Sequence, residues 1–264
     1  MDRASPAEQE WWVEVRGGEL FVKSWAPSRI SDPAPLFLFH DSLGCVELWR
    51  DFPRQLSTGL ARVVVAYDRL GYGRSSERMD PPSADFIAEE ARDFFPAVLR
   101  SVGGQRFDLF GHSVGGGMAV ACAGKIPGCQ TVVTESAQAF VEPRTVEGIR
   151  KAKQGFEDPV NFNRLARYHG AKASWVLRAW TDFWLSPEVA GWSLAPLLAE
   201  VRCPLLAIHG DADEYGSKAF PETIQRLAGG ESESRIVPGC GHVPHREKPG
   251  LILEILRDFY YRKL

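Results

Sequence analysis

The sequence predicts an α/β protein with a doubly wound, mostly parallel sheet and a helical cap insertion. Short apolar runs alternate along the chain with segments of helical character, and this alternation is typical of parallel strands joined by helical crossovers. The alternation stops over residues 141–198, where no strand-like run occurs. We therefore expect one core domain, made of residues 1–140 and 199–264, with a cap at residues 141–198 that lies over the sheet.

The expected elements follow one another in a simple order. A hairpin opens the chain, because "WWVEV" and "ELFVKSW" flank the glycine pair Gly17-Gly18. Helices are expected at residues 84–102, at residues 114–125 and, as a closing amphipathic helix, at residues 247–264. The remaining strands are short runs, most of them nearly continuous in apolar residues, as in strands buried on both faces. These runs are "PLFLFHD", "RVVVAYD", "RFDLFG", "QTVVTES", "CPLLAIHGD" and "SRIVPG".

The composition is that of an ordinary globular protein and excludes several classes of partner. Of the 264 residues, 44% are hydrophobic and 25% are charged, so the chain can bury a sizeable core. The formal net charge of -3 gives no reason to expect nucleic acid or an anionic membrane as a partner. The first residues, "MDRASPAEQEWW", lack the apolar segment of a secretory signal. No apolar run approaches the roughly 18 residues that a membrane span needs.

The cysteines favour a reducing environment. The chain has five, an odd number, and none of them forms a C-x-x-C pair. Free thiols are therefore expected in place of a disulfide framework or a zinc site, and the expected location is cytoplasmic. A homo-oligomer is compatible with the sequence, which does not define the oligomeric state. The five residues are Cys45, Cys122, Cys129, Cys203 and Cys240.

The segment 141–198 contains half of the eight tryptophans of the chain. Trp180 and Trp184 are one helical turn apart, so both can project from the same face of a helix. Two interpretations stay open for this face. Its aromatic rings either line a substrate pocket or only pack the cap onto the core, as most apolar helical stripes do.

A serine stands where a buried strand is expected to end. Gly111 to Gly115 reads G-H-S-V-G and fits the G-x-S-x-G motif, in which a sharp strand-to-helix turn exposes the hydroxyl of the central residue, here Ser113. Three glycines, Gly115 to Gly117, follow the serine within the first helical turn, and each costs about 0.8–1 kcal/mol relative to alanine. A helix with a purely structural role has little reason to accept that cost. The glycines therefore indicate a nucleophile presented at a helix N-terminus, where backbone N–H groups favour negative charge.

Later segments supply a base and an acid for this serine. A serine hydroxyl is a poor nucleophile until a base accepts its proton, and His242 follows a strand-like run and a glycine-rich turn. A carboxylate must orient the base, and both Asp211 and Asp213 lie just beyond a buried strand. The chain order is Ser, Asp, His, which differs from the order in chymotrypsin-like and subtilisin-like proteases.

Five motifs together resemble the α/β-hydrolase superfamily, in the right order and over nearly all of the chain. The resemblance implies a triad of Ser113, Asp213 and His242, because the family places the acid third after the glycine of its acid loop. Some members carry the acid at the end of an earlier strand, which is Glu135 here. The five motifs are "FLFHDSLG" for the oxyanion loop, "YDRLGYGRSS" for the turn after the fourth strand, "GHSVGG" for the nucleophile elbow, "GDAD" for the acid loop and "GCGH" for the histidine loop.

The same resemblance implies that the backbone amides of Ser42 and Val114 form the oxyanion hole. The chain departs from the family pattern at one position, because the usual His-Gly pair reads His40-Asp41. A carboxylate that pointed into the hole would disfavour negative charge there. Asp41 is therefore expected either to point away or to bind a polar group of the substrate.

The resulting prediction is a cofactor-independent, carboxylesterase-like serine hydrolase that uses no metal. Its partner is a small-molecule substrate, a small to medium and partly apolar ester or lactone, cleaved through an acyl-enzyme. Asp41, Trp180 and Trp184 are the predicted substrate-binding residues. Thioester hydrolysis and hydrolytic C–C cleavage on the same triad remain alternatives. A ligand receptor on a hydrolase scaffold, with little or no turnover, is an alternative from a different functional class.

Overall fold

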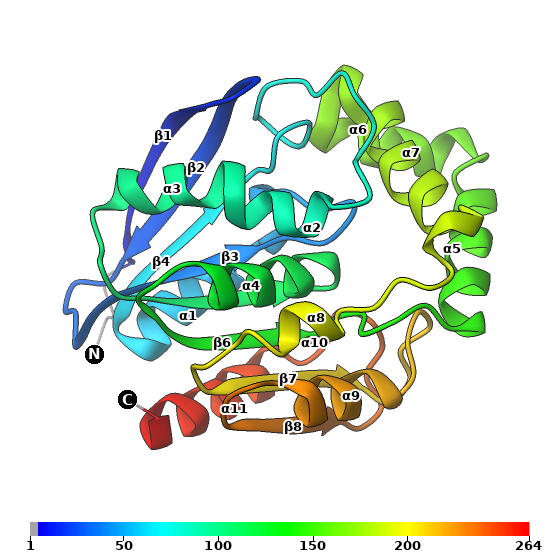
Figure 1. Cartoon of the computed structure of the whole chain (residues 1–264). Helices are drawn as coiled ribbons and strands as arrows, with labels where there is room; N and C mark the ends of the chain where they lie inside the picture. The colour runs from blue at the N-terminus through cyan, green and yellow to red at the C-terminus, as the bar shows by residue number, and fades with distance from the viewer. Residues whose placement is uncertain (1–4, 264) are drawn as a thin grey trace.

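The computed structural model describes residues 5–263 as a mostly parallel sheet with helices on both faces (Figure 1). The strands lie in the order β1-β2-β4-β3-β5-β6-β7-β8, with β1 antiparallel to β2, β2 antiparallel to β4, and the others parallel. This confirms the predicted doubly wound architecture. The strands are β1 Ala7–Val15, β2 Gly18–Ala26, β3 Asp32–Phe39, β4 Arg62–Tyr67, β5 Phe107–His112, β6 Cys129–Glu135, β7 Leu205–Gly210 and β8 Ser232–Val237.

Two apolar cores, one on each face, hold the helices to the sheet. Alternate residues of β3 belong to different cores: Phe37 and Phe39 face one, while Leu36 and Leu38 face the other. This alternation explains why the strand sequence is continuously apolar. The first core is completed by α2 Phe86–Glu89, α3 Phe95–Val102, α4 Val114–Lys125, α8 Ala195–Leu198 and α9 Ala219–Leu227, and the second by α1 Phe52–Leu60 and α11 Pro249–Lys263.

The helix predicted over residues 84–102 contains an irregular turn. Residues Glu90–Phe94 form a π-helical turn, η2, between α2 and α3. Pro96 lies just beyond it, and proline has no backbone N–H and clashes with the carbonyl four residues earlier. A π turn relieves this conflict without ending the helix. It also turns the carboxyl group of Glu90 into the interior, where the residue is only 3% exposed.

The segment between β6 and β7 is helical, as its lack of strand-like runs predicts. Its helices α5 Pro143–Gly155, α6 Pro159–His169 and α7 Ala173–Trp184 lie together at the upper right of Figure 1, to one side of the sheet. A small apolar cluster joins Tyr72, in the turn after β4, to Leu165 and Val176 of these helices. The boundaries 141–198 for a cap stay a prediction.

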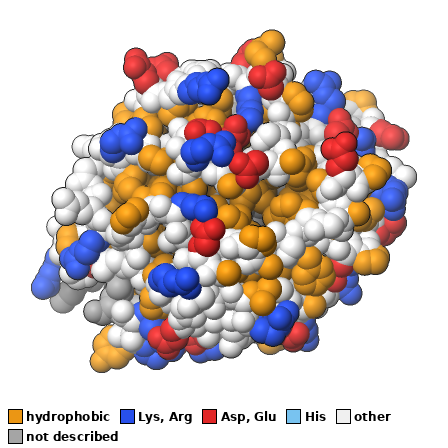
Figure 2. Space-filling model, in the orientation of Figure 1, with side chains coloured by type: hydrophobic (Ala, Val, Ile, Leu, Met, Phe, Trp, Pro, Cys, Tyr) orange, Lys and Arg blue, Asp and Glu red, His pale blue; other side chains and the backbone are white. Residues whose placement is uncertain are grey.

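Two of the sequence-based expectations include residues at the ends of the chain that the structure does not describe. Residues 1–4 belong to the segment expected to lack a secretory signal, and they lie outside the described residues, as does Leu264 at the end of the closing helix. Within the described part, no helix is both long enough and apolar enough to span a membrane. Figure 2 shows hydrophobic side chains gathered in the middle of one face, with charged side chains among and around them.

Candidate active site

Ser113 alone forms the turn between β5 and α4. Its backbone has φ 55° and ψ −125°, an uncommon and strained conformation for a residue with a Cβ. Two hydrogen bonds hold the turn: the Ser113 amide donates to the carbonyl oxygen of Glu135 at 2.8 Å, and the amide of Gly116 donates to the carbonyl oxygen of Ser113 at 2.9 Å. This is the strand-turn-helix geometry that presents a nucleophile above a sheet.

The glycines around Ser113 allow α4 to approach the sheet closely. A Cβ on Gly115 would lie 2.2 Å from the carbonyl oxygen of Phe39, and one on Gly111 would lie 2.1 Å from the carbonyl oxygen of Gly115. A Cβ on Gly116 would lie 2.6 Å from a neighbouring side chain, whereas one on Gly117 would make only ordinary contacts from 3.5 Å. The first two glycines after the serine are therefore required by close packing, Gly115 against the backbone and Gly116 against a side chain, and the third is not.

His242 and Asp213 form a hydrogen-bonded pair. Nδ1 of His242 lies 2.9 Å from Oδ2 and 3.0 Å from Oδ1 of Asp213, and Oδ1 also accepts from the amides of Tyr215 and Gly216 at 2.8 and 3.2 Å. Burial alone would raise the pKa of Asp213, but the hydrogen bond and charge of His242 and the charge of His209 lower it below its usual value. The buried carboxylate is therefore ionised at neutral pH and fixes the orientation of the imidazole.

The two other carboxylates considered for this position have different partners. Oδ1 of Asp211 accepts from the amide of Gly239 at 2.7 Å at the surface of the histidine loop. Glu135 is fully buried, and its Oε2 is bound to Nδ1 of His245. Neither carboxylate is hydrogen-bonded to His242.

Ser113 and His242 line the same cavity, which has a volume of about 260 Å³. Within residues 5–263, no hydrogen bond joins the Ser113 hydroxyl to His242. Nδ1 of His242 is bound to Asp213, so Nε2 is the ring nitrogen that remains for the cavity. Catalytic hydrogen bonds are often long before a substrate binds, so this geometry is compatible with a nucleophile and its base.

The loop after β3 contributes Ser42 to this cavity. Ser42 lines the cavity, and Val114, as the first residue of α4, has an N–H group without an intrahelical acceptor. His40 holds the loop in place, because its Nε2 accepts from the amide of Arg69 at 3.1 Å and its Nδ1 donates to the carbonyl oxygen of Asp41 at 2.8 Å. The sequence-predicted oxyanion residues thus lie on the two segments that flank Ser113.

Asp41 faces a histidine from the nucleophile motif. Its side chain is 32% exposed and lines the cavity, Oδ1 accepts from the amide of Leu43 at 2.8 Å, and Oδ2 lies 3.4 Å from Nδ1 of His112. The other ring nitrogen of His112, Nε2, lies 2.8 Å from the carbonyl oxygen of His242. Burial alone would lower the pKa of His112, but the hydrogen bond and charge of Asp41, helped by the charge of Glu135, raise it to about 9. The sequence did not predict this pair.

Comparison with known proteins agrees with the fold. Residues 36–255 match the model of the Alpha/beta hydrolase family. The chain belongs to the alpha/beta hydrolase family. Serine hydrolase BPHL of Mus musculus is 31% identical over 218 residues, which are 74% of this chain and 68% of that protein. Monoglyceride lipase of Homo sapiens is 28% identical over 265 residues, 93% of this chain and 87% of that protein.

A solved structure with the same fold belongs to a proline iminopeptidase from Mycobacterium smegmatis. It matches with a TM-score of 0.76 and covers 97% of this chain and 98% of its own. The two chains are only 20% identical, so this likeness shows the shared fold alone. Esterase- and lipase-like proteins are among the relatives of this alpha/beta hydrolase.

The two predicted substrate-binding tryptophans of α7 have different surroundings. Trp180 lines the cavity at Ser113, where its ring centroid lies 5.9 Å from that of Tyr215. Trp184 is only 2% exposed and stacks edge-on against Trp192 and Phe183 in the core, and it does not line the cavity. Residues four apart on a helix differ by about 40° in direction, which is enough to turn the second ring from the cavity into the core. The expectation that both rings reach the pocket is corrected for Trp184.

Most of the residues that line the cavity were not predicted from the sequence as site residues, and Leu43, Leu48 and Tyr215 are examples. Leu43 and Leu48 line the side of the cavity that follows the oxyanion loop, and Tyr215 places its ring centroid 4.7 Å from that of His242. Each lies within a few positions of a recognised motif. Proximity to a motif was the only available signal, because leucine and tyrosine carry no chemistry that marks them as site residues.

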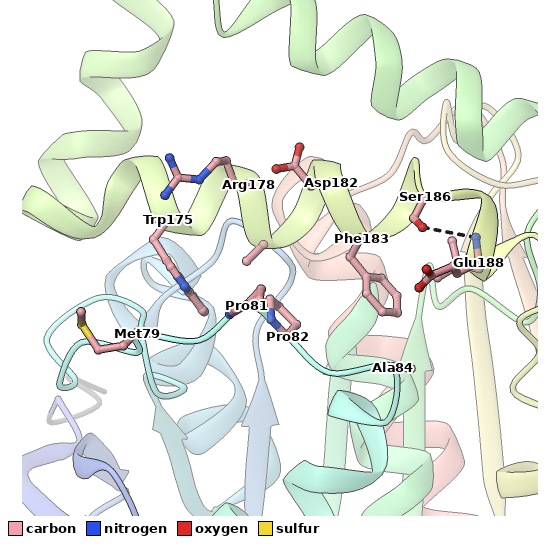
Figure 3. Close-up of a pocket in the computed structure, with 12 residues that line it drawn as sticks. Met79, Pro81, Pro82, Ala84, Trp175, Arg178, Asp182, Phe183, Ser186 and Glu188 are labelled. Atoms are coloured by element: carbon pink, nitrogen blue, oxygen red, sulfur yellow. Dashed lines mark hydrogen bonds between the residues drawn. The ribbon is translucent and has the colours of Figure 1, made fainter.

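A second cavity lies on the other side of α7. It has a volume of about 460 Å³, and Figure 3 shows Trp175 and Phe183 of α7 projecting toward the loop that carries Met79, Pro81 and Pro82. Although it is the larger cavity, none of the predicted catalytic residues lines it. Helix α7 therefore separates the cavity at Ser113 from this one.

One buried group has the composition of a metal site. The ligand atoms of His112, Glu135 and His245 all lie within 4.8 Å of one another. The hydrogen bond between His245 Nδ1 and Glu135 Oε2 already occupies two of these atoms. The third residue, His112, directs its ring nitrogens at Asp41 and at the carbonyl oxygen of His242. Hydrogen bonding thus accounts for the arrangement without an ion.

Proposed function

We propose that this protein is a serine esterase in which Ser113 is the nucleophile, His242 the general base and Asp213 the residue that orients the base. The observation that carries the proposal is the meeting of a strained serine turn and an Asp-His pair at one cavity. A nucleophile, a base and a carboxylate with these roles define a triad by geometry and not by sequence position.

The proposed reaction proceeds through an acyl-enzyme. Nε2 of His242 accepts the proton of the Ser113 hydroxyl as Oγ bonds to the ester carbonyl carbon, and the carbonyl oxygen becomes an oxyanion. The amides of Ser42 and Val114 donate to that oxyanion. The bond to the leaving oxygen then breaks as His242 returns the proton to it. Water repeats the sequence in the second half and releases the acid.

The dimensions and lining of the cavity support a small to medium, partly apolar ester or lactone as the substrate. About 260 Å³ adjoins Ser113, and a further cavity of about 310 Å³ shares Leu43 and Leu48 with it. The second cavity is lined largely by apolar side chains, including Phe156 and Leu165 of the helical segment. A substrate with its reacting carbonyl at Ser113 and an apolar arm beyond Leu43 and Leu48 would use both.

The test is hydrolysis of p-nitrophenyl acetate and butyrate by the wild type and by Ser113→Ala. Removal of a triad member is expected to lower kcat by roughly 10³-fold or more without loss of the fold, since alanine removes the hydroxyl and little volume. Ser28→Ala is a matched control, because Ser28 is exposed in the loop between β2 and β3. A folded Ser113→Ala protein within about tenfold of wild-type activity would refute the nucleophile assignment. Ester binding without turnover in the wild type would instead favour the receptor alternative.

A further inference from the structure

Asp41 places a carboxylate where the family pattern has an uncharged glycine. Its side chain is partly exposed to the cavity and is adjacent in sequence to Ser42, a proposed oxyanion donor. An unpaired carboxylate there would oppose the negative charge that develops on the substrate. The amide of Leu43, which donates to Oδ1 of Asp41, carries no net charge and does not neutralise the carboxylate. A positive charge close to the carboxylate would do so.

His112 has the geometry of that positive charge. Its Nδ1 faces Oδ2 of Asp41 at 3.4 Å, and its Nε2 faces the carbonyl oxygen of His242 at 2.8 Å. A carbonyl oxygen can only accept a hydrogen bond, and an ionised carboxylate can only accept one as well. A neutral ring that donates from Nε2 to the carbonyl oxygen would direct the lone pair of Nδ1 at the carboxylate of Asp41, which is repulsive. A second proton on Nδ1 makes this contact an ion pair, and an imidazole with two N–H groups is a cation.

We propose that His112 is a permanent imidazolium and a positioning residue, which neutralises Asp41 beside the oxyanion hole and holds the main chain of His242 over Ser113. The catalytic consequence of this proposal rests on the proposed function, but the charge of His112 can be measured whether or not the protein is an esterase. The proposal also explains the unusual Asp41, because its carboxylate and the histidine of G-H-S-V-G form an ion pair.

The charged and titratable groups around His112 are consistent with this state. Asp41 faces it from the loop after β3, Glu135 from the end of β6, His242 from the histidine loop and His245 from α10 Pro244–Glu247, with ring centroids 5.1 and 5.0 Å away for the two histidines. Burial lowers the pKa of His245, so it adds no competing positive charge at neutral pH. The two carboxylates outweigh the cost of burying the charge and raise the pKa of His112 to about 9.

The decisive measurement is the protonation state of His112 by nitrogen NMR on protein labelled at its six histidines. The His112→Gln variant identifies the signals by their loss. We expect imidazolium shifts for His112 from pH 6 to 8, and a titration midpoint that falls by at least about one pH unit in Asp41→Asn. A neutral ring at pH 7 in the wild type, or a midpoint that does not move in Asp41→Asn, would overturn the proposal.

A double-mutant cycle tests the catalytic consequence. In His112→Gln, Asp41 loses its counter-charge, and kcat for p-nitrophenyl acetate is expected to fall about 30-fold or more while KM changes less than about threefold. In Asp41→Asn with His112→Gln, no unpaired charge remains, so kcat should recover at least about fivefold relative to His112→Gln alone. Glu47→Gln, which removes an exposed carboxylate from the same loop region, should leave kcat unchanged.

The alternative outcomes separate the proposals from each other. A merely structural His112 would give a double variant no better than His112→Gln, and this result would overturn the neutralising role. If His112→Gln fails to fold in a thermal melt, the NMR titrations of wild type and Asp41→Asn decide the question, with signals assigned from His245→Gln and the other histidine variants. An active Ser113→Ala would refute the proposed function, whereas the charge of His112 would still stand or fall by NMR.

Discussion

Glu90 makes the stability of this protein depend on pH in a direction that can be measured. The residue lies in the π turn η2, is 3% exposed, and its Oε1 accepts from the hydroxyl of Tyr67 at 2.6 Å. Burial raises the pKa of Glu90 from 4.5 to about 7, although the Tyr67 hydrogen bond and the charge of Arg69 act in the opposite direction. The folded state therefore favours the protonated carboxyl group.

The sign and size of the effect follow from linkage. Because the folded-state pKa lies above the unfolded-state value, the contribution of Glu90 is fully favourable below pH 4.5 and is lost as the pH rises through about 7. A shift of this size corresponds to roughly 3.4 kcal/mol at high pH, of which about 2.5 kcal/mol develops between pH 5 and pH 8. Glu90→Gln keeps an acceptor for Tyr67 and removes the ionisation.

Urea unfolding at pH 5 and pH 8 measures this contribution. The free energy of unfolding of Glu90→Gln, taken relative to wild type, is expected to increase by about 2.5 kcal/mol between the two pH values. Glu254→Gln, on the exposed face of α11, is the control and should keep the wild-type dependence on pH. A difference between Glu90→Gln and wild type that stays the same at both pH values would refute the reasoning, because it would mean that Glu90 ionises equally in both states.

The remaining predictions concern the proposed catalytic residues and the helix α7. Asp213→Asn should lower kcat by about 10³- to 10⁴-fold, with much smaller losses for Asp211→Asn and Glu135→Gln; the assignment fails if kcat assays find Asp213→Asn the mildest. Trp180→Ala should change the ranking of p-nitrophenyl esters by acyl length, since its ring lines the cavity. Trp184→Ala should keep the ranking but lower the unfolding free energy by about 3–5 kcal/mol, and the reverse pattern would contradict the placement of the two rings.

Motifs defined by backbone geometry could be predicted from the sequence. Ser113 was found because a strained turn at the end of a buried strand needs small neighbours, and packing against Phe39 indeed excludes a side chain at Gly115. The strands were found because burial on both faces makes them continuously apolar. The helix over residues 114–125 matches α4 to the residue. In each case the physical cause of the structure is local and leaves its mark on the residue types.

Interactions between distant segments could not be predicted in this way. The helices α1 and α9 were not among the expected elements, because their patterns are short and only their packing partners define a buried face. The ion pair of Asp41 with His112 joins residues 71 positions apart, by the difference of their numbers, and neither residue alone signals it. Likewise, only the packing of α7 separates Trp180, in the cavity, from Trp184, in the core.

Around Ser113, three carboxylates each face a histidine, and their differences explain why only one pair can move a proton. The pairs are Asp41 with His112, Asp213 with His242, and Glu135 with His245. In the first pair Nε2 of His112 is bound to a carbonyl oxygen and Nδ1 faces a carboxylate, so the imidazolium proposed above has no lone pair to accept a proton. In the third pair the ring is buried against Trp49 and Phe52, with centroids 4.7 and 5.1 Å away, and does not line the cavity. Of the three pairs, only the second has a ring nitrogen without a hydrogen bond at the cavity, namely Nε2 of His242. The carbonyl oxygen of His242 accepts the hydrogen bond from Nε2 of His112 in the first pair. In the proposals made above, the first pair therefore positions the base, and the second carries out the proton transfer.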